Sequence, residues 1–278
     1  MPQLASPPNV SSSKWIDTFA RLGYATKGIL YSLIGLFAIL AAFQAGGQTT
    51  DSQGVLTTLA DQPFGQFMLV LIGLGLIGYA LWRLVEVVKD PEHPNSSGAE
   101  SVFHRLSYLV KVFIYGGLAF SAFKLAFGSG GGGGGSTQES VARVMSLPLG
   151  RWLVALGGAL VLGGAFYEMY RGFKAKFRGK LKLHEMSQKE RTWATRVGRL
   201  GLIARSLVFS LIGIFALQAA YYTNPSRIQD PGQALQTLQQ WANPWVFAVI
   251  ALGLLAYGIH MFFMARYGRI ATGQGESR

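Results

Sequence analysis

The sequence predicts an all-α membrane protein in which six transmembrane helices form three parallel two-helix repeats, with pseudo-threefold symmetry about the membrane normal. Three observations support this prediction: six long apolar segments, an asymmetric distribution of basic residues, and a pattern that recurs three times. The chain has 278 residues, half of them apolar and 14% charged, and its mean hydropathy is +0.30. Because soluble domains carry about 25% charged residues, a soluble enzyme is not expected.

Six segments are long enough to cross a bilayer. A helix needs roughly 20 mostly apolar residues to span a hydrocarbon layer of about 30 Å. The segments cover residues 26–45, 64–84, 109–127, 152–170, 202–221 and 245–265. Core helices of a soluble bundle would show a polar face at the helical period, whereas these segments are apolar on all sides. We therefore interpret each one as a transmembrane span.

The basic residues lie almost entirely on one side of these spans. If the N-terminus is cytoplasmic, 21 Lys and Arg residues face the inside and four face the outside, against nine and four acidic residues. The net charge of +12 therefore lies wholly on the inner side, as the positive-inside rule requires. We expect a multi-pass protein of the bacterial inner membrane, or of another internal bacterial membrane, with both termini cytoplasmic. The basic charge indicates a membrane face rather than a nucleic-acid partner.

A repeated pattern relates the spans to one another. The first, third and fifth spans open with an Arg, a base six residues later, an aromatic residue four beyond that, and small residues at fixed offsets. The three copies are Arg21, Lys27, Tyr31, Ser32 and Gly35; Arg105, Lys111, Tyr115, Gly116 and Ala119; and Arg199, Arg205, Phe209, Ser210 and Gly213. The pattern predicts copies of equal orientation, related by an axis along the membrane normal.

The even-numbered spans repeat as well. Each follows a proline and a short amphipathic segment, and each carries two glycines five residues apart. The prolines are Pro63, Pro148 and Pro244, and the aligned glycine pairs are Gly73 and Gly78, Gly158 and Gly163, and Gly253 and Gly258. One repeat is thus a helix, an outer loop with a surface helix, and a second helix. Asp230 is a candidate cap for the last surface helix, with Pro231 in its first turn.

These units divide the chain into six parts. The expected parts are a cytoplasmic tail (1–19), repeat 1 (20–90), repeat 2 (103–175, with a glycine-rich outer loop at 128–136), a basic cytoplasmic loop (176–197), repeat 3 (198–268) and a second cytoplasmic tail (269–278). The run Gly128–Ser136 is typical of a flexible connector.

Three stretches resemble the bacterial "domain of unknown function" family 1206. They are residues 23–31 (GYATKGILY), 59–65 (LADQPFG) and 75–83 (GLIGYALWR). The resemblance covers nearly the whole chain, from about Trp15 to Arg269. Repeat 2 departs most, with Gly164 in place of Tyr79 and Glu168 in place of Arg83. The resemblance implies three tandem two-helix repeats in a membrane, and it implies no catalytic residue or substrate.

Three basic residues lie unusually deep in the spans. Lys27, Lys111 and Arg205 stand about two turns inside, at equivalent places in the repeats. One interpretation is that they extend toward the cytoplasmic headgroups. The other is that near-threefold symmetry gathers them, together with Tyr31, Tyr115 and Phe209, around a vestibule that binds an anion or an acidic lipid headgroup. The repeat-opening residues Arg21, Arg105 and Arg199 belong to the same candidate anion- or headgroup-binding set.

Arg83, Glu168 and His260 are the other polar candidates within the membrane. We expect Glu168 to pair with Arg171 three residues later, and His260 to be a satisfied donor between helices. Ionisable groups in a bilayer often mark ion pathways. A proton relay has little support here, because the outer halves of the spans are apolar.

The loop between the fourth and fifth spans is strongly basic. From Arg171 to Arg199 it holds ten bases and two acids, interleaved with Phe173, Phe177, Leu181, Leu183 and Trp193. A basic helix of this composition binds an anionic leaflet. Alternatively, the charges only orient the protein.

No enzyme or cofactor motif is present in the sequence. The chain has no Cys, which excludes disulfides and thiolate metal sites, and it shows no metal-binding or nucleophile motif. We predict a non-enzymatic accessory or scaffold protein without a cofactor, whose partners are anionic membrane lipids or another membrane protein. The alternative is a small channel or carrier along the pseudo-threefold axis, for which few polar groups are available.

Overall fold

The computed structural model describes residues 14–44, 48–89, 99–128 and 137–269. In these residues it forms nine α-helices: α1 (Lys14–Ala42), α2 (Ser52–Ala60), α3 (Gly65–Lys89), α4 (Ala99–Ala126), α5 (Thr137–Met145), α6 (Gly150–Phe173), α7 (Gln188–Tyr221), α8 (Pro231–Trp241) and α9 (Pro244–Tyr267). Six of them are long and apolar enough to cross a membrane, as predicted.

The expected ends of the parts differ in detail. Helix α1 already begins at Lys14, inside the segment expected as a cytoplasmic tail. Residues 1–13, residues 270–278 and most of the glycine-rich loop (129–136) lie outside the described residues.

Each repeat folds as a long helix, a short helix and a second long helix. The turn into the second long helix is the same in the first two repeats, where Phe64 and Leu149 both have φ of 64°. The glycine that follows has no room for a side chain. A Cβ on Gly65 would lie 2.1 Å from the Leu59 carbonyl oxygen, and one on Gly150 would lie 1.9 Å from that of Val144. The Pro-x-Gly sequence therefore specifies this turn.

The third repeat reaches the same arrangement by capping. Asp230 and Gln233 form a capping box at the start of α8, with Pro231 in its first turn, as predicted. Asn243 then caps α9, which begins at Pro244. Proline fits at the first helical position because the amide that it lacks has no partner within the helix.

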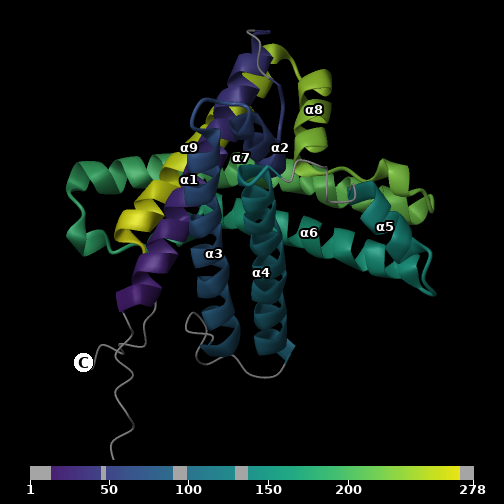
Figure 1. Ribbon diagram of the computed structural model, residues 1–278, viewed down its shortest axis with the longest axis horizontal. Helices are drawn as coiled ribbons and strands as arrows, with labels where there is room; N and C mark the ends of the chain where they lie inside the picture. The colour runs from purple at the N-terminus through teal and green to yellow at the C-terminus, as the bar shows by residue number, and fades with distance from the viewer. Residues whose placement is uncertain (1–13, 45–47, 90–98, 129–136, 270–278) are drawn as a thin grey trace, which may run out of the picture.

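The most extensive helix contacts join neighbouring repeats. Helix α1 packs along α9, α3 along α4, and α6 along α7. Within repeats, α1 packs on α3 and α7 on α9, while in the described residues α4 and α6 share at most isolated contacts. The three pairs run in clearly different directions (Figure 1). The all-α multi-span class is confirmed, and the common threefold axis is not.

Small residues allow the two long helices to pack together within repeats 1 and 3. In repeat 1, a Cβ on Gly23 would lie 2.5 Å from the Tyr79 Cβ. In repeat 3, a Cβ on Gly201 would lie 2.5 Å from the Tyr257 Cα. Repeat 2 has Ser107 in place of the glycine and Gly164 in place of the tyrosine, so this contact is absent and its two spans separate.

A second close contact corrects the predicted register of the even spans. Gly75 meets Thr26 in repeat 1, and Gly253 meets Ala204 at the equivalent place in repeat 3. The alignment of Gly73 with Gly253 is therefore wrong by two residues. Repeat 2 carries Leu160 at this place, and its bulk further opposes a close approach.

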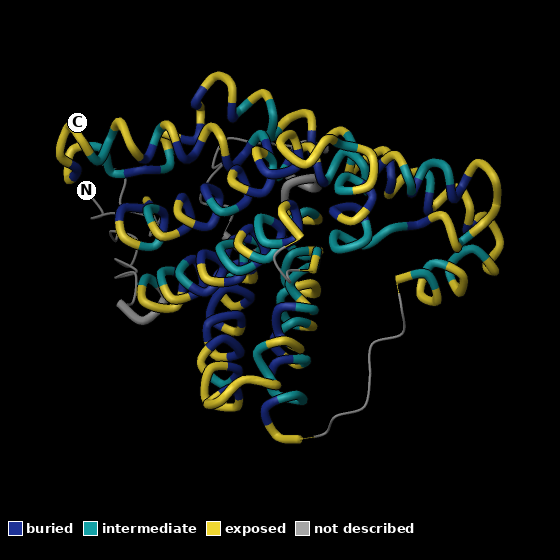
Figure 2. The backbone as a smooth tube through the Cα atoms, turned by 90° about the horizontal axis from the view of Figure 1, so that it is seen from above, coloured by how far each residue is buried: buried dark blue, intermediate teal, exposed yellow. Residues whose placement is uncertain are grey.

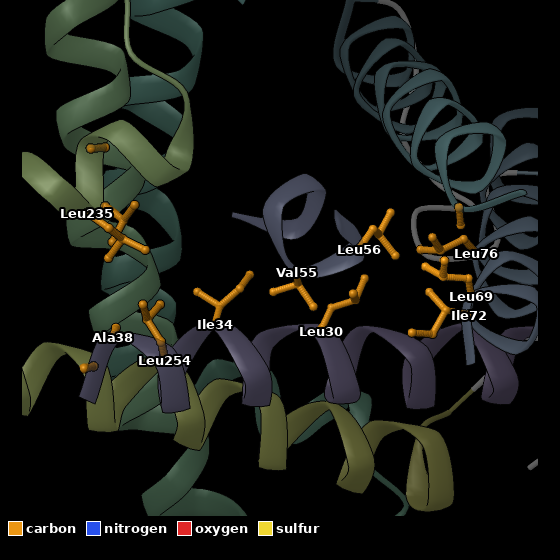
Figure 3. Close-up of a cluster of buried hydrophobic side chains, with 14 of the residues drawn as sticks. Leu30, Ile34, Ala38, Val55, Leu56, Leu69, Ile72, Leu76, Leu235 and Leu254 are labelled. Atoms are coloured by element: carbon orange, nitrogen blue, oxygen red, sulfur yellow. The ribbon is translucent and has the colours of Figure 1, made fainter. Parts of the chain in front are cut away.

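The short helix α2 fills the core between α1 and α3, at the end of the spans where the chain passes from one helix to the other. Val55 and Leu56 are fully buried, and Figure 3 shows Val55 beside Leu30 of α1 and Leu56 turned toward Leu69 of α3. Buried residues gather where the helices meet, and exposed ones lie along the outer surfaces (Figure 2).

The basic loop folds against the protein. It forms two short 3-10 helices, Lys176–Lys180 and Leu183–Glu185. Phe177 and Leu181 are buried against α7 and α9, and the Lys182 amide donates to the Tyr267 carbonyl at 2.8 Å. The expectation of a basic α-helix with these apolar residues facing the lipid is therefore wrong. Phe173 and Trp193 remain exposed.

Candidate functional site

Lys27 is buried within a group of tyrosines. Only 5% of the residue is exposed. Its Nζ donates a hydrogen bond to the Tyr79 hydroxyl at 3.3 Å and lies 4.7 Å from the centroid of the Tyr79 ring and 5.0 Å from that of Tyr115. No carboxylate pairs with it among the described residues, so its charge is met by one weak hydrogen bond and two aromatic faces.

Arg83 joins the same tyrosine from the next turn of α3. Its Nε and Nη2 donate to the Tyr79 hydroxyl at 2.9 and 2.7 Å, and Nη2 lies 3.4 Å from the Tyr24 hydroxyl. Its Nη1 pairs with Glu86, whose side chain is fully buried. This ion pair neutralises Arg83 inside the protein.

Arg205 forms the corresponding pair between repeats 2 and 3. It donates to Glu168 of α6 and to the Tyr31 hydroxyl of α1, the latter at 3.1 Å. Its guanidinium carbon lies 4.2 Å from the Phe209 ring centroid and 5.2 Å from that of Tyr257. The expected partner of Glu168, Arg171, is therefore replaced by a residue from another helix.

Lys111 has the poorest partners of the four cations. Its Nζ lies 5.3 Å from the centroid of the Tyr108 ring, and among the described residues it forms no hydrogen bond or ion pair. It is repelled by Arg83 and Lys27 and attracted by Glu86 and Glu168.

These residues form one cation–tyrosine cluster. It comprises four cations (Lys27, Arg83, Lys111 and Arg205), two carboxylates (Glu86 and Glu168) and six tyrosines (Tyr24, Tyr31, Tyr79, Tyr108, Tyr115 and Tyr257). Within it, edge-to-face ring contacts join two groups of tyrosines: the centroids of Tyr79 and Tyr115 lie 4.5 Å apart, and those of Tyr31 and Tyr257 lie 4.6 Å apart. With all ionisable side chains of Lys, Arg and Glu charged, the cluster carries two net positive charges.

The three repeat-opening arginines stand apart from this cluster. Arg21 pairs with Asp17 at 2.6 Å and donates to the carbonyls of Ala265 and Arg266 at the end of α9. Arg105 and Arg199 are exposed. The structure thus brings Lys27, Lys111 and Arg205 together, but not Arg21, Arg105 and Arg199.

His260 differs from its expected role. The side chain is buried, but its Nδ1 has no hydrogen-bond partner in the described part of the chain. Its ring packs edge-on against Phe177, with centroids 5.0 Å apart. The basic loop therefore covers this histidine.

Sequence reasoning missed Glu86, Tyr79 and Tyr257. The three-residue spacing of Arg83 and Glu86 indicates an ion pair on one helix face. Residues 75–79 read GLIGY and residues 253–257 read GLLAY, and the corresponding stretch of repeat 2, 160–164, reads LVLGG. Comparison of these three stretches would have identified the two tyrosines and the repeat that lacks one.

Comparison with known proteins agrees with the division of the chain into three repeats. The family model "Domain of Unknown Function (DUF1206)" matches three times, over residues 22–90, 106–175 and 200–268. The chain belongs to the DUF1206 family. The DUF1206 repeats coincide with the three helix–short helix–helix units. An uncharacterised relative, YxxB of Bacillus subtilis (strain 168), is 34% identical over 255 residues, which cover 91% of each chain. No solved structure matches the chain.

Proposed function

We propose that this multi-pass membrane protein is a non-enzymatic accessory or scaffold protein that binds the anionic headgroup of an inner-membrane phospholipid at the cation–tyrosine cluster. The supporting observation is the excess of positive charge there. Glu86 and Glu168 pair with Arg83 and Arg205, so that Lys27 and Lys111 have no carboxylate partner of their own in the part of the chain that the structure describes.

A phosphate headgroup matches this arrangement chemically. Lys27 has one hydrogen bond and Lys111 only a ring contact, so both ammonium groups retain donors for phosphate oxygens. Charged groups in a membrane protein are expensive unless they are paired, and an anion between the two lysines would lower this cost. Tyrosine hydroxyls nearby would add further donors.

The alternative function, a channel or carrier, has less support. The outer end of the helices is filled by the side chains of α2, α1 and α3, among them Val55, Leu56 and Leu30. An aqueous path needs polar lining groups, and the polar groups gather instead in the cation–tyrosine cluster.

Thermal unfolding in vesicles tests this proposal. Phosphatidylglycerol is expected to raise the Tm above its value in phosphatidylcholine, and the double variant K27Q/K111Q is expected to lose most of this gain. The control K174Q/K189Q removes the same charge from exposed positions at the end of α6 and the start of α7, on either side of the basic loop, and is expected to keep this gain. Equal losses in both variants would contradict the proposal and indicate general surface attraction. The Tm of each variant in neutral detergent shows how far the substitutions destabilise the protein without lipid, so that this effect can be separated from lost lipid binding.

A further inference from the structure

We infer that the open side of repeat 2, between α4 and α6, is where the acyl chains of this phospholipid lie and where the lipid enters. The inference rests on the proposed function for the headgroup. It adds that the acyl chains lie on one face of the protein, and that this face is uncovered because of the residues of repeat 2.

The two spans of repeat 2 are the least covered of the six. Only 17% of the most apolar window of α4, and the same share of α6, is buried, against 50–56% for α1, α3 and α9. The exposed apolar side chains include Phe113 and Phe120 on α4 and Leu156 and Leu160 on α6. Added Cβ atoms on the repeat 2 glycines 116, 117, 157, 163 and 164 would meet nothing within 4 Å.

The separation of α4 and α6 affects the cation–tyrosine cluster. In repeats 1 and 3 a tyrosine of the second span closes the hairpin and contacts the cation of the first span, Tyr79 with Lys27 and Tyr257 with Arg205. Repeat 2 has Gly164 at this place, so Lys111 lacks the corresponding partner. The cation of the cluster with the fewest partners, Lys111, therefore belongs to the repeat whose two spans separate.

An acidic phospholipid combines the two properties that this place requires. Its phosphate complements the net positive charge of the cluster, and its chains cover apolar faces that no protein element covers. An anion without chains would satisfy only the first property. A transmembrane helix of another protein would cover the apolar faces only, and native mass spectrometry would detect it as a bound protein rather than a lipid.

The test restores the missing tyrosine. The variant G164Y puts a ring on the face of α6 that it shares with Glu168, four residues away. The matched control G163Y adds the same ring about 140° around the helix from Glu168. An added Cβ meets no atom within 4 Å at either glycine, so the first side-chain atom of each variant has room.

The readout is phospholipid retained by the full-length protein in mild detergent, measured by native mass spectrometry. Long-chain phosphatidylglycerol is compared with a short-chain phosphatidylglycerol that carries the same headgroup. Displacing as few as two methylene groups weakens chain binding about tenfold. We therefore expect G164Y to lose long-chain lipid at least about tenfold, to keep the short-chain lipid, and G163Y to resemble the parent protein.

Three results would overturn the inference. They are unchanged long-chain binding in G164Y, equal losses in G164Y and G163Y, and retention of a protein partner instead of lipid at this face. In each case the proposed headgroup site is judged separately in this experiment, because it fails here if K27Q/K111Q retains the short-chain lipid as well as the parent does.

Discussion

The ion pair between Glu168 and Arg205 provides a quantitative prediction. The side chains are 31% and 13% exposed, so the pair lies between the exposed and the fully buried cases. Removing one partner of a buried pair costs about 3–5 kcal/mol, and an exposed pair contributes less than about 1 kcal/mol. In E168Q, Arg205 keeps the Tyr31 hydroxyl and the Phe209 ring. We therefore expect the free energy of unfolding to fall by about 2 kcal/mol.

Reversible unfolding in mixed micelles measures this change. The single variants E168Q and R205Q and their double variant form a thermodynamic cycle, in which the pair should contribute a coupling free energy of about 1–2 kcal/mol. The control E185Q removes a carboxylate on the basic loop that pairs with Lys182, and it should change stability by less than about 0.5 kcal/mol.

Lipid binding should move in the opposite direction. E168Q raises the net charge of the cation–tyrosine cluster, so the remaining folded protein should bind phosphatidylglycerol at least as tightly as the parent does. Additive effects of E168Q and R205Q, or weaker lipid binding by folded E168Q, would refute this reasoning.

Three further predictions concern helix α2 and the turns on either side of it. Leu56 is fully buried, so L56A should lower the unfolding free energy by about 2–5 kcal/mol in equilibrium unfolding, and a change below about 1 kcal/mol would contradict its core position. G65A brings a Cβ to 2.1 Å from the Leu59 carbonyl oxygen and should lower the Tm, whereas an unchanged Tm would rule out the tight turn. Burial and then the charge of Asp230 raise the pKa of Asp51. A raised pKa favours the protonated carboxyl in the folded state, so this group's contribution to stability falls as pH rises through the folded pKa. D51N keeps the cap, and its Tm should depend less on pH than that of the parent as the pH rises above the ordinary pKa of an aspartate; identical pH profiles would contradict this assignment.

Features with local causes were predictable from the sequence. The six spans follow from length and hydropathy, and the turns into the second spans follow from a proline and a glycine that has no room for a side chain. The gathering of Lys27, Lys111 and Arg205 was one of the two interpretations that their equal offsets in the repeats allowed, beside extension toward the headgroups.

Features set by contacts between repeats were not predictable in this way. Glu168 has a local candidate in Arg171, but it pairs with Arg205 because α6 packs along α7. Phe177 and Leu181 match the pattern of a membrane-facing helix, yet α7 and α9 offer them a protein surface to cover. Repeat 2 differs at Ser107 in α4 and at Leu160 and Gly164 in α6, and the joint effect of these differences lies in how the two spans pack.

The most direct test of the account is the contact between lipid phosphate and the two lysines. Solid-state NMR of the protein in phosphatidylglycerol bilayers, with nitrogen-labelled lysine side chains, measures transfer from lipid phosphorus to Nζ. The account predicts a signal that K27Q and K111Q each reduce. In K27Q/K111Q only the background from exposed lysines should remain, and K174Q/K189Q should reduce that background. A phosphorus contact that is unchanged in K27Q/K111Q would contradict it.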